Sequence, residues 1–136
     1  MSSVKTVGSV LVKYNDEVLL CKRSPKQSMA NMWSIPGGHI HKNEPPRIGA
    51  EREFFEETNL EAKDLHLVGF LQGKDPRNET LVYVFLMEVN ERIEPDLNNA
   101  KDGREHVGCK YFKVDTLPIE DSDDQLRKII KKVLKK

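Results

Sequence analysis

Acidic side chains are crowded into one short segment, GGHIHKNEPPRIGAEREFFEETNL, which covers residues 37–60. Residues 47–58 are strong helix formers without proline, so this part is predicted to be helical. At about 100° per residue, Glu57 and Glu56 fall at about 40° and about 300° from Glu53, so the carboxylates share one arc of about 100°. Like charges at this spacing modestly destabilise a helix. A divalent cation removes that repulsion, and clustered hard oxygen ligands suit magnesium or manganese.

The opposite side of this helix carries Ile48 and Phe55, at about 220° and about 200°. We therefore expect the Ile48 and Phe55 side to pack in the core while the carboxylates face away from it. The helix alone leaves an alternative open, in which a solvated acidic face uses Arg52 as its ion partner.

The remaining segments predict a mixed sheet with helices on both of its faces. Strands are predicted at residues 4–14, 18–21, 65–72, 80–89 and 109–114, with a short extended piece at 33–35. The first two strands are predicted to form a hairpin around Asn15 and Asp16. Residues 122–136 are predicted to form a second helix, since apolar residues recur there at spacings of three and four. Ser122 with Gln125 resembles a capping box at its start.

Length and charge exclude several classes of protein. The 136 residues suit one domain, residues 1–136. The 22 Lys and Arg residues balance the 22 Asp and Glu residues, so the basic excess typical of nucleic-acid and membrane-surface binders is missing. No signal-peptide pattern or membrane-spanning apolar run is found in the sequence. Cys21 and Cys109 lie in strand-like stretches, and we expect reduced, buried thiols in a cytoplasmic protein.

The acidic segment also has a recognisable spacing. From Gly38 it runs through five residues to Glu44 and seven more to REFFEETNL at residues 52–60. This resembles the Nudix box, G-x5-E-x7-R-E-U-x-E-E-x-G-U, where U is a bulky apolar residue. The matching positions are Gly38, Glu44, Arg52, Glu53, Glu56, Glu57 and Leu60. Phe54 stands at the first U position, and Asn59 replaces the family's glycine at the helix end. Because asparagine tolerates the left-handed conformation best after glycine, we expect the helix cap to be kept.

The resemblance implies an α/β fold, the Nudix α/β/α sandwich, with a mixed sheet between helices. It also implies divalent-metal-dependent hydrolysis of the pyrophosphate linkage in a nucleoside diphosphate linked to another moiety. Mg²⁺, or alternatively Mn²⁺, would be held by Glu53, Glu56 and Glu57, and one of these would act as a base.

The same resemblance gives roles to the rest of the box. Arg52 would orient a box glutamate through a charge-assisted hydrogen bond. Glu44 would brace the loop through backbone amides. Gly37 and Gly38 would let the backbone approach the metal and the phosphate.

Outside the box, further residues are candidates for the site. Glu105 lies where many Nudix enzymes place an extra acidic ligand or base, and His106 beside it could act as a base at neutral pH. Arg23, at the end of a predicted strand, could bind a phosphate. Trp33 could stack on a base or ribose, or it could belong to the core. For Glu105, His106 and Arg23 a solvated surface position is the alternative.

Two substrate classes compete. Residues 75–77, Asp-Pro-Arg, resemble a loop of Nudix ADP-ribose pyrophosphatases, and Arg77 would then contact the distal part of the substrate. Trp33 and the short chain instead resemble MutT-type nucleoside triphosphate pyrophosphohydrolases. We favour ADP-ribose or a dinucleoside polyphosphate. A non-catalytic sensor or interaction module is a third alternative, although such modules usually lose box acids. The expected partner is a small-molecule nucleotide, not a membrane or a stably bound nucleic acid, and a homodimer is left open.

Overall fold

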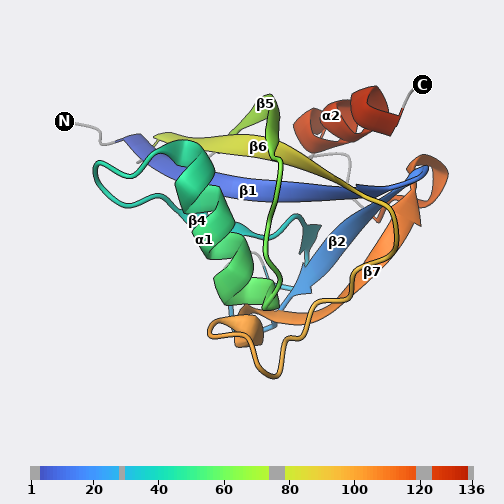
Figure 1. Ribbon diagram of the computed structural model, residues 1–136, viewed down its shortest axis with the longest axis horizontal. Helices are drawn as coiled ribbons and strands as arrows, with labels where there is room; N and C mark the ends of the chain where they lie inside the picture. Colours follow the sequence, from blue (N-terminus) through green and yellow to red (C-terminus); the bar gives the residue numbers. More distant parts are fainter. Residues whose placement is uncertain (1–3, 28–29, 74–78, 119–123, 135–136) are drawn as a thin grey trace.

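One mixed sheet lies between two helices in the computed structural model, which describes residues 4–27, 30–73, 79–118 and 124–134 (Figure 1). The elements follow in the order β1 (Val4–Tyr14), β2 (Glu17–Arg23), β3 (Trp33–Ser34), β4 (Gly37–His39), α1 (Pro46–Thr58), β5 (His66–Gln72), β6 (Glu79–Val89), η1 (Gly103–Glu105), β7 (His106–Lys113), η2 (Val114–Thr116) and α2 (Asp124–Leu134). Here η marks a 3₁₀ helix. The predicted α/β class, with a mixed sheet between helices, is confirmed.

Strand β1 organises the sheet, whose main path is β3-β2-β1-β6-β5. One edge of β1 pairs in parallel with β6 along its whole length. The other edge is shared, because residues 7–9 pair with β4 while only Lys13 and Tyr14 pair with β2. The predicted hairpin is therefore very short, and β2 instead pairs with β7. As a result, the β1–β6 and β2–β7 arms diverge from the β1–β2 turn, and α1 lies where they are far apart (Figure 1).

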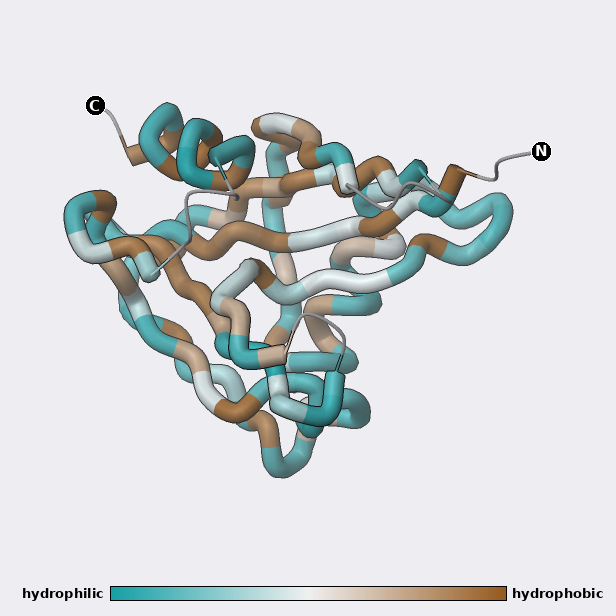
Figure 2. The backbone as a smooth tube through the Cα atoms, turned by 180° about the vertical axis from the view of Figure 1, so that it is seen from behind, coloured by the Kyte–Doolittle hydropathy of each residue, from teal (hydrophilic) through white to brown (hydrophobic). Residues whose placement is uncertain are grey.

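The two faces of the sheet build separate apolar clusters. Side chains alternate along β1, so Leu11 packs in one cluster with Ile130 of α2, and Val10 packs in the other with Phe54 of α1. Figure 2 shows the hydrophobic stretches running along the central strands, with hydrophilic backbone mostly in the connecting loops and on the helices. The core thus fixes α1 and α2 on opposite faces.

Helix α1 is rotated away from the expected orientation. Ile48 and Phe55 are 42% and 48% exposed, so the expectation that they pack in the core is wrong. The buried positions are Gly49, Ala50, Phe54, Glu57 and Thr58. Small residues determine this face, because they let the helix backbone approach β1 closely. A Cβ added at Gly8 would lie 2.8 Å from the Ala50 nitrogen. The close approach places Glu57 in the middle of the buried side of the helix.

Strands β2 and β7 are also joined covalently. Cys21 and Cys109 lie directly opposite each other in the antiparallel register, with their Cα atoms 4.0 Å apart, and they form a disulfide. The expectation of two reduced thiols is therefore wrong, because the register brings together cysteines that are 88 residues apart in the chain. The expected cytoplasmic location stays a prediction.

Helix α2 has the apolar stripe expected from its sequence, with Leu126, Ile130 and Val133 buried. The first residue of the expected capping box, Ser122, lies outside the described residues. The side chain of Gln125 contacts the backbone of β5 instead. It accepts a hydrogen bond from the backbone N–H of Gln72 and donates one to the backbone carbonyl oxygen of Gln72. Of the helices described, none has both the length and the apolar character needed to cross a membrane.

Candidate active site

The candidate residues meet around the C-terminal half of α1, although they come from distant parts of the chain. Helix α1 crosses the open side of the sheet and ends beside η1 and the start of β7 (Figure 1). The elements bring together Glu53, Glu56 and Glu57 of α1, Gly37 and Gly38 of β4, Arg23 of β2, Glu105 of η1 and His106 of β7.

Arg52 ties the acidic side chains to one another. Its Nε and Nη2 donate to the two carboxylate oxygens of Glu44, at 2.9 and 3.1 Å. Its Nη1 donates to Glu53 Oε2 at 2.8 Å and lies 3.2 and 3.3 Å from the two oxygens of Glu56. Nη2 also donates to the carbonyl oxygen of His39 at 2.9 Å. The guanidinium is therefore fully committed to the protein, which raises the pKa of Arg52 further.

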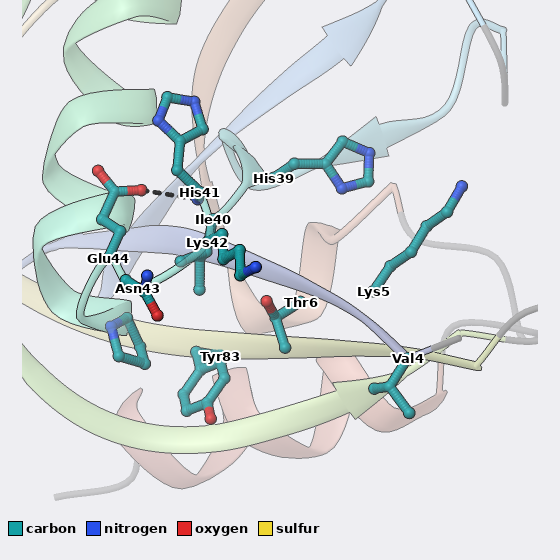
Figure 3. Close-up of a pocket in the computed structure, with 11 residues that line it drawn as sticks. Val4, Lys5, Thr6, His39, Ile40, His41, Lys42, Asn43, Glu44 and Tyr83 are labelled. Carbon is teal, nitrogen blue, oxygen red and sulfur yellow. Dashed lines mark hydrogen bonds between the residues drawn. The ribbon is translucent and has the colours of Figure 1, made fainter. Parts of the chain in front are cut away.

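Glu44 holds the loop between β4 and α1. Besides its bidentate contact with Arg52, it accepts the backbone N–H of His41 at 2.9 Å (Figure 3). The Arg52 hydrogen bonds, followed by the His41 N–H, lower the pKa of Glu44 to about 2. Glu44 also borders a hollow of about 430 Å³ at the start of α1, which includes Lys5 and Tyr83 but not Glu53, Glu56 or Glu57. The carboxylate cluster is therefore separate from this hollow.

Glycines of β4 give α1 the room to approach. A Cβ added at Gly38 would overlap Oε1 of Glu53, and one added at Gly37 would lie 2.7 Å from the Cα of Ser9. Gly37 also directs its backbone N–H toward Glu57 Oε1, at 3.4 Å. Glycine is thus required at position 37 by backbone contacts of β1, while Gly38 leaves room for the Glu53 carboxylate.

Glu57 and His106 form a buried pair without full hydrogen bonding. Glu57 is 1% exposed, and its Oε1 lies 3.6 Å from Nε2 of His106. Burial, with the nearby carboxylates of Glu105 and Glu53, raises the pKa of Glu57 to about 9. Burial, with the charge of Arg23, lowers the pKa of His106 to about 4. Both pKa shifts favour the uncharged form of the side chain, which weakens any ion pair between Glu57 and His106. Within the described part of the chain, Glu57 Oε2 and His106 Nδ1 have no hydrogen-bond partner.

The strand end that carries Arg23 is fastened to η1. The Ser24 N–H donates to the carbonyl oxygen of Glu105 at 2.8 Å, and Arg23 pairs with His106 in the β2–β7 register. Partial burial, with the charge of Asp102, raises the pKa of Glu105, while Arg23 lowers it. The structure thus brings Arg23 and Glu105 to the same edge of the carboxylate cluster.

The remaining predicted site residues are placed differently. Trp33 packs edge-on against Phe112, with ring centroids 5.1 Å apart, and it borders the α2-side apolar cluster. Its described contacts are therefore those of a core residue. Arg77, together with the rest of the 75–77 loop, lies outside the described residues.

Sequence reasoning missed the contribution of the polar stretch before η1. The N–H of Asp96 donates to the carbonyl oxygen of Thr58 at 2.8 Å, and the N–H of Asp102 donates to that of Glu56 at 2.6 Å. These bonds satisfy carbonyl groups of the last turn of α1, which have no partner within the helix. Lys101 also places its Nζ 3.9 Å from Glu56 Oε2. Because backbone N–H groups make the main contacts, no residue type in the sequence marks them.

The cluster offers hard oxygen donors for a cation. Across the described residues, no group of three or more His, Cys, Asp or Glu side chains is already arranged to hold a metal ion. Glu53 and Glu56 instead point their carboxylates at Arg52. The donor chemistry nevertheless fits magnesium or manganese, because Glu53 and Glu105 lie near a buried Glu57 oxygen that has no partner in the described part of the chain.

Comparisons with known proteins indicate one family and its fold. The model of the NUDIX domain matches residues 3–133. A human relative named diphosphoinositol polyphosphate phosphohydrolase 3-alpha is 35% identical over 101 residues, covering 74% of this chain and 57% of the relative. The chain therefore spans little more than half the length of that protein.

Solved structures share the fold at lower sequence identity. A MutT protein from Methanosarcina mazei superposes with a TM-score of 0.79 at 18% identity, covering 99% of this chain and 98% of the other. A C. elegans Ap4A hydrolase superposes with a TM-score of 0.74 at 19% identity, covering 96% and 97%. These likenesses support the fold.

Proposed function

Because the chain belongs to the Nudix family, we propose that it hydrolyses the pyrophosphate linkage of a phosphorylated small molecule in a divalent-metal-dependent reaction. One observation carries this proposal: Glu57 is a nearly fully buried carboxyl group near other carboxylates, and one of its oxygens has no partner among the described residues. A buried polar atom without a partner is costly, and a fold has no structural reason to keep it. A strongly perturbed pKa in an acidic cluster is typical of a functional site.

We assign Glu53, Glu56 and Glu57 as the residues that would hold Mg²⁺ or Mn²⁺. All three lie on the same half of α1, and Arg52 holds the carboxylates of Glu53 and Glu56 in the present arrangement. When bound, the cation would activate water and neutralise phosphate oxygens. The side chains of Glu53 and Glu56 now point at Arg52, so they would have to turn toward Glu57 to share the cation with it.

The surrounding residues position these groups. Glu44 and the carbonyl oxygen of His39 hold the guanidinium of Arg52, which orients Glu53 and Glu56. Gly38 allows Glu53 to lie against the backbone of β4. Neither Arg52 nor Glu44 needs to touch the substrate for this role.

The opposite edge of the cluster would supply the base and a phosphate contact. We propose that Glu105, whose pKa is raised by partial burial, accepts a proton from the attacking water. Arg23, on the strand end fastened to η1, would bind a phosphate of the substrate. Gly37 and Gly38 would let that phosphate approach the backbone, and Trp33 and Arg77 remain proposed contacts for the rest of the substrate.

Among substrates, we favour those in which phosphates link two moieties, such as ADP-ribose or a dinucleoside polyphosphate. The similarity to a protein named for diphosphoinositol polyphosphate adds that compound class. A nucleoside triphosphate is the alternative, and a cytoplasmic location and a homodimer stay predictions.

A substrate panel tests the proposal. The protein is incubated with MgCl₂ and ADP-ribose, Ap4A, a diphosphoinositol polyphosphate or a deoxynucleoside triphosphate, and products are separated by anion-exchange chromatography. Matched samples contain EDTA. We expect hydrolysis that stops in EDTA and returns with excess Mg²⁺ or Mn²⁺. Preferred turnover of the triphosphate would replace the favoured substrate class, and metal binding without turnover of any compound would favour a non-catalytic module.

A further inference from the structure

We propose that Lys101 binds a phosphate group of the substrate at the rim of the carboxylate cluster. The inference rests on the proposed function and names a residue on the polar stretch before η1. Lys101 is 74% exposed at its side chain, and its ammonium group lies beside Glu56, one of the carboxylates assigned to the cation.

The position of Lys101 is set by its backbone neighbours. The N–H of Asp102 donates to the Glu56 carbonyl oxygen at 2.6 Å, and the N–H of Gly103 donates to the carbonyl oxygen of Ala100 at 3.3 Å. The first bond attaches the residue next to Lys101 to the last turn of α1, and the second closes a local turn that contains Lys101. A flexible side chain therefore starts from a fixed point next to the cluster.

The contact between Lys101 and Glu56 does not use up the ammonium group. Its Nζ lies 3.9 Å from Glu56 Oε2, longer than the roughly 2.7–2.9 Å of a charge-assisted hydrogen bond. Both Glu56 oxygens already lie within hydrogen-bond distance of Arg52 Nη1. An exposed ion pair of this kind contributes little to stability, so stability alone gives no strong reason for the placement.

Of the other cations of the site, Arg52 is committed to the protein, whereas Arg23 is already proposed to bind a phosphate. Arg52 directs its donors to Glu44, Glu53, Glu56 and the His39 carbonyl oxygen. Arg23 lies close enough to lower the pKa of Glu57, Glu105 and His106. A substrate with several phosphates is repelled by the carboxylates of the site, and a nearby cation offsets that repulsion. Lys101 supplies a further positive charge beside Glu56, whereas Arg23 acts on Glu57 and Glu105.

Replacement of Lys101 by alanine tests the inference against a closely matched control. Lys128 of α2 is 76% exposed at its side chain and lies 3.3 Å from Asp124, so Lys128→Ala removes an equally exposed lysine that also faces a carboxylate but lies on the other helix. We expect Lys101→Ala to raise KM by about tenfold with kcat nearly unchanged, which is the signature of lost ground-state and transition-state binding alike. Lys101→Arg should restore most of the affinity, and Lys128→Ala should behave as wild type.

A binding measurement separates this inference from the proposed function. Isothermal titration with inorganic tripolyphosphate and MgCl₂ needs no turnover, and we expect a Kd about tenfold weaker for Lys101→Ala than for Lys128→Ala, with a smaller loss of affinity on adding salt. If the wild type hydrolyses nothing, the proposed function fails while the titration still decides the role of Lys101. Equal Kd values for the two alanine variants would overturn the inference. So would a fall in kcat with unchanged KM and Kd, because Lys101 would then act through Glu56.

Discussion

Glu44 and Glu57 stand at opposite ends of α1, and their surroundings drive the same chemical group in opposite directions. Glu44 receives two hydrogen bonds from Arg52 and one from a backbone N–H, and its pKa falls to about 2. Glu57 is buried with one oxygen unpartnered among the described residues, and its pKa rises to about 9. The Glu44 end is complete without a ligand, whereas the Glu57 end is not. The contrast indicates that Glu44 has a structural role in the site, whereas Glu57 is suited to binding a ligand.

The largest expected effect is a loss of turnover when Glu56 or Glu57, near the C-terminal end of α1, is changed. We expect Glu57→Gln, and likewise Glu56→Gln, to lower kcat by at least about 100-fold, because the amide keeps the shape but loses the charge needed to hold a cation. Steady-state kinetics with MgCl₂ measures this. Glu51→Gln is the matched control, since Glu51 lies on the same helix and pairs only loosely with Arg47, at 3.9 Å. Turnover within a few-fold of wild type in both variants would remove the metal assignment.

The next effect concerns stability against pH in EDTA. The pKa of Glu57 is raised from 4.5 to about 9 in the fold, so its contribution is fully present below about pH 4.5 and is lost as pH rises through about 9. We therefore expect the wild-type unfolding free energy to decline over that window relative to Glu57→Gln. Urea denaturation at about pH 5 and about pH 9 measures the difference. Added MgCl₂ should reduce the decline, and parallel curves for the two proteins would show that Glu57 is not held uncharged.

For Glu44, before the start of α1, the contribution to stability changes with pH in the opposite direction. The pKa of Glu44 is lowered from 4.5 to about 2, so its carboxylate stabilises the fold above about pH 4.5, and that stabilisation is lost as pH falls through about 2. We expect Glu44→Gln to cost about 1.5–3 kcal/mol near neutral pH, the range for hydrogen bonds to charged groups. The gap between variant and wild type should close in acid. Denaturant curves across the acid range check this, and a constant gap would mean that the hydrogen bonds do not depend on the charge.

The sequence predicted the two ends of α1 unequally well. The spacing from Gly38 to Leu60 identified Glu44 and Arg52, and the structure joins them directly. It did not reveal that Glu57 is buried, because apolar residues were assumed to define the core side of α1. The buried side instead carries Phe54 together with the small residues Gly49 and Ala50. Periodicity of apolar residues worked for α2, whose packing depends on large side chains.

Long-range pairing explains the other gaps. Strand positions were predicted well, but not that β2 pairs mainly with β7, which is what unites Cys21 with Cys109 and Arg23 with His106. Contacts between elements distant in the chain depend on register, which local patterns do not encode. The attachment of the Asp96–Asp102 stretch to α1 was missed for the related reason that backbone groups make it.

The smallest expected effect tests whether the backbone alone sets the Glu57 end of α1. Asn59, in place of the family's glycine, has φ 62° and ψ 22°, and its N–H caps the carbonyl oxygen of Phe55 at 2.8 Å. Glycine relieves the left-handed strain but increases the freedom of the unfolded chain, so these effects largely cancel. We expect Asn59→Gly to change the unfolding free energy by less than about 0.5 kcal/mol, in the stabilising direction if at all.

Asn59→Ala provides the contrast, because alanine cannot adopt that conformation cheaply and should lose about 1 kcal/mol or more. Denaturant unfolding of both variants, with turnover measured in parallel, gives the comparison. If both variants lose stability equally, the asparagine side chain makes a contact that matters, and the end of α1 depends on more than a left-handed backbone. If only alanine loses stability while turnover falls with it, the position of Glu57 is tied to the helix cap. The position of Glu57 would then depend on the backbone conformation of Asn59, two residues away, whereas the position of Glu44 depends on the side chain of Arg52.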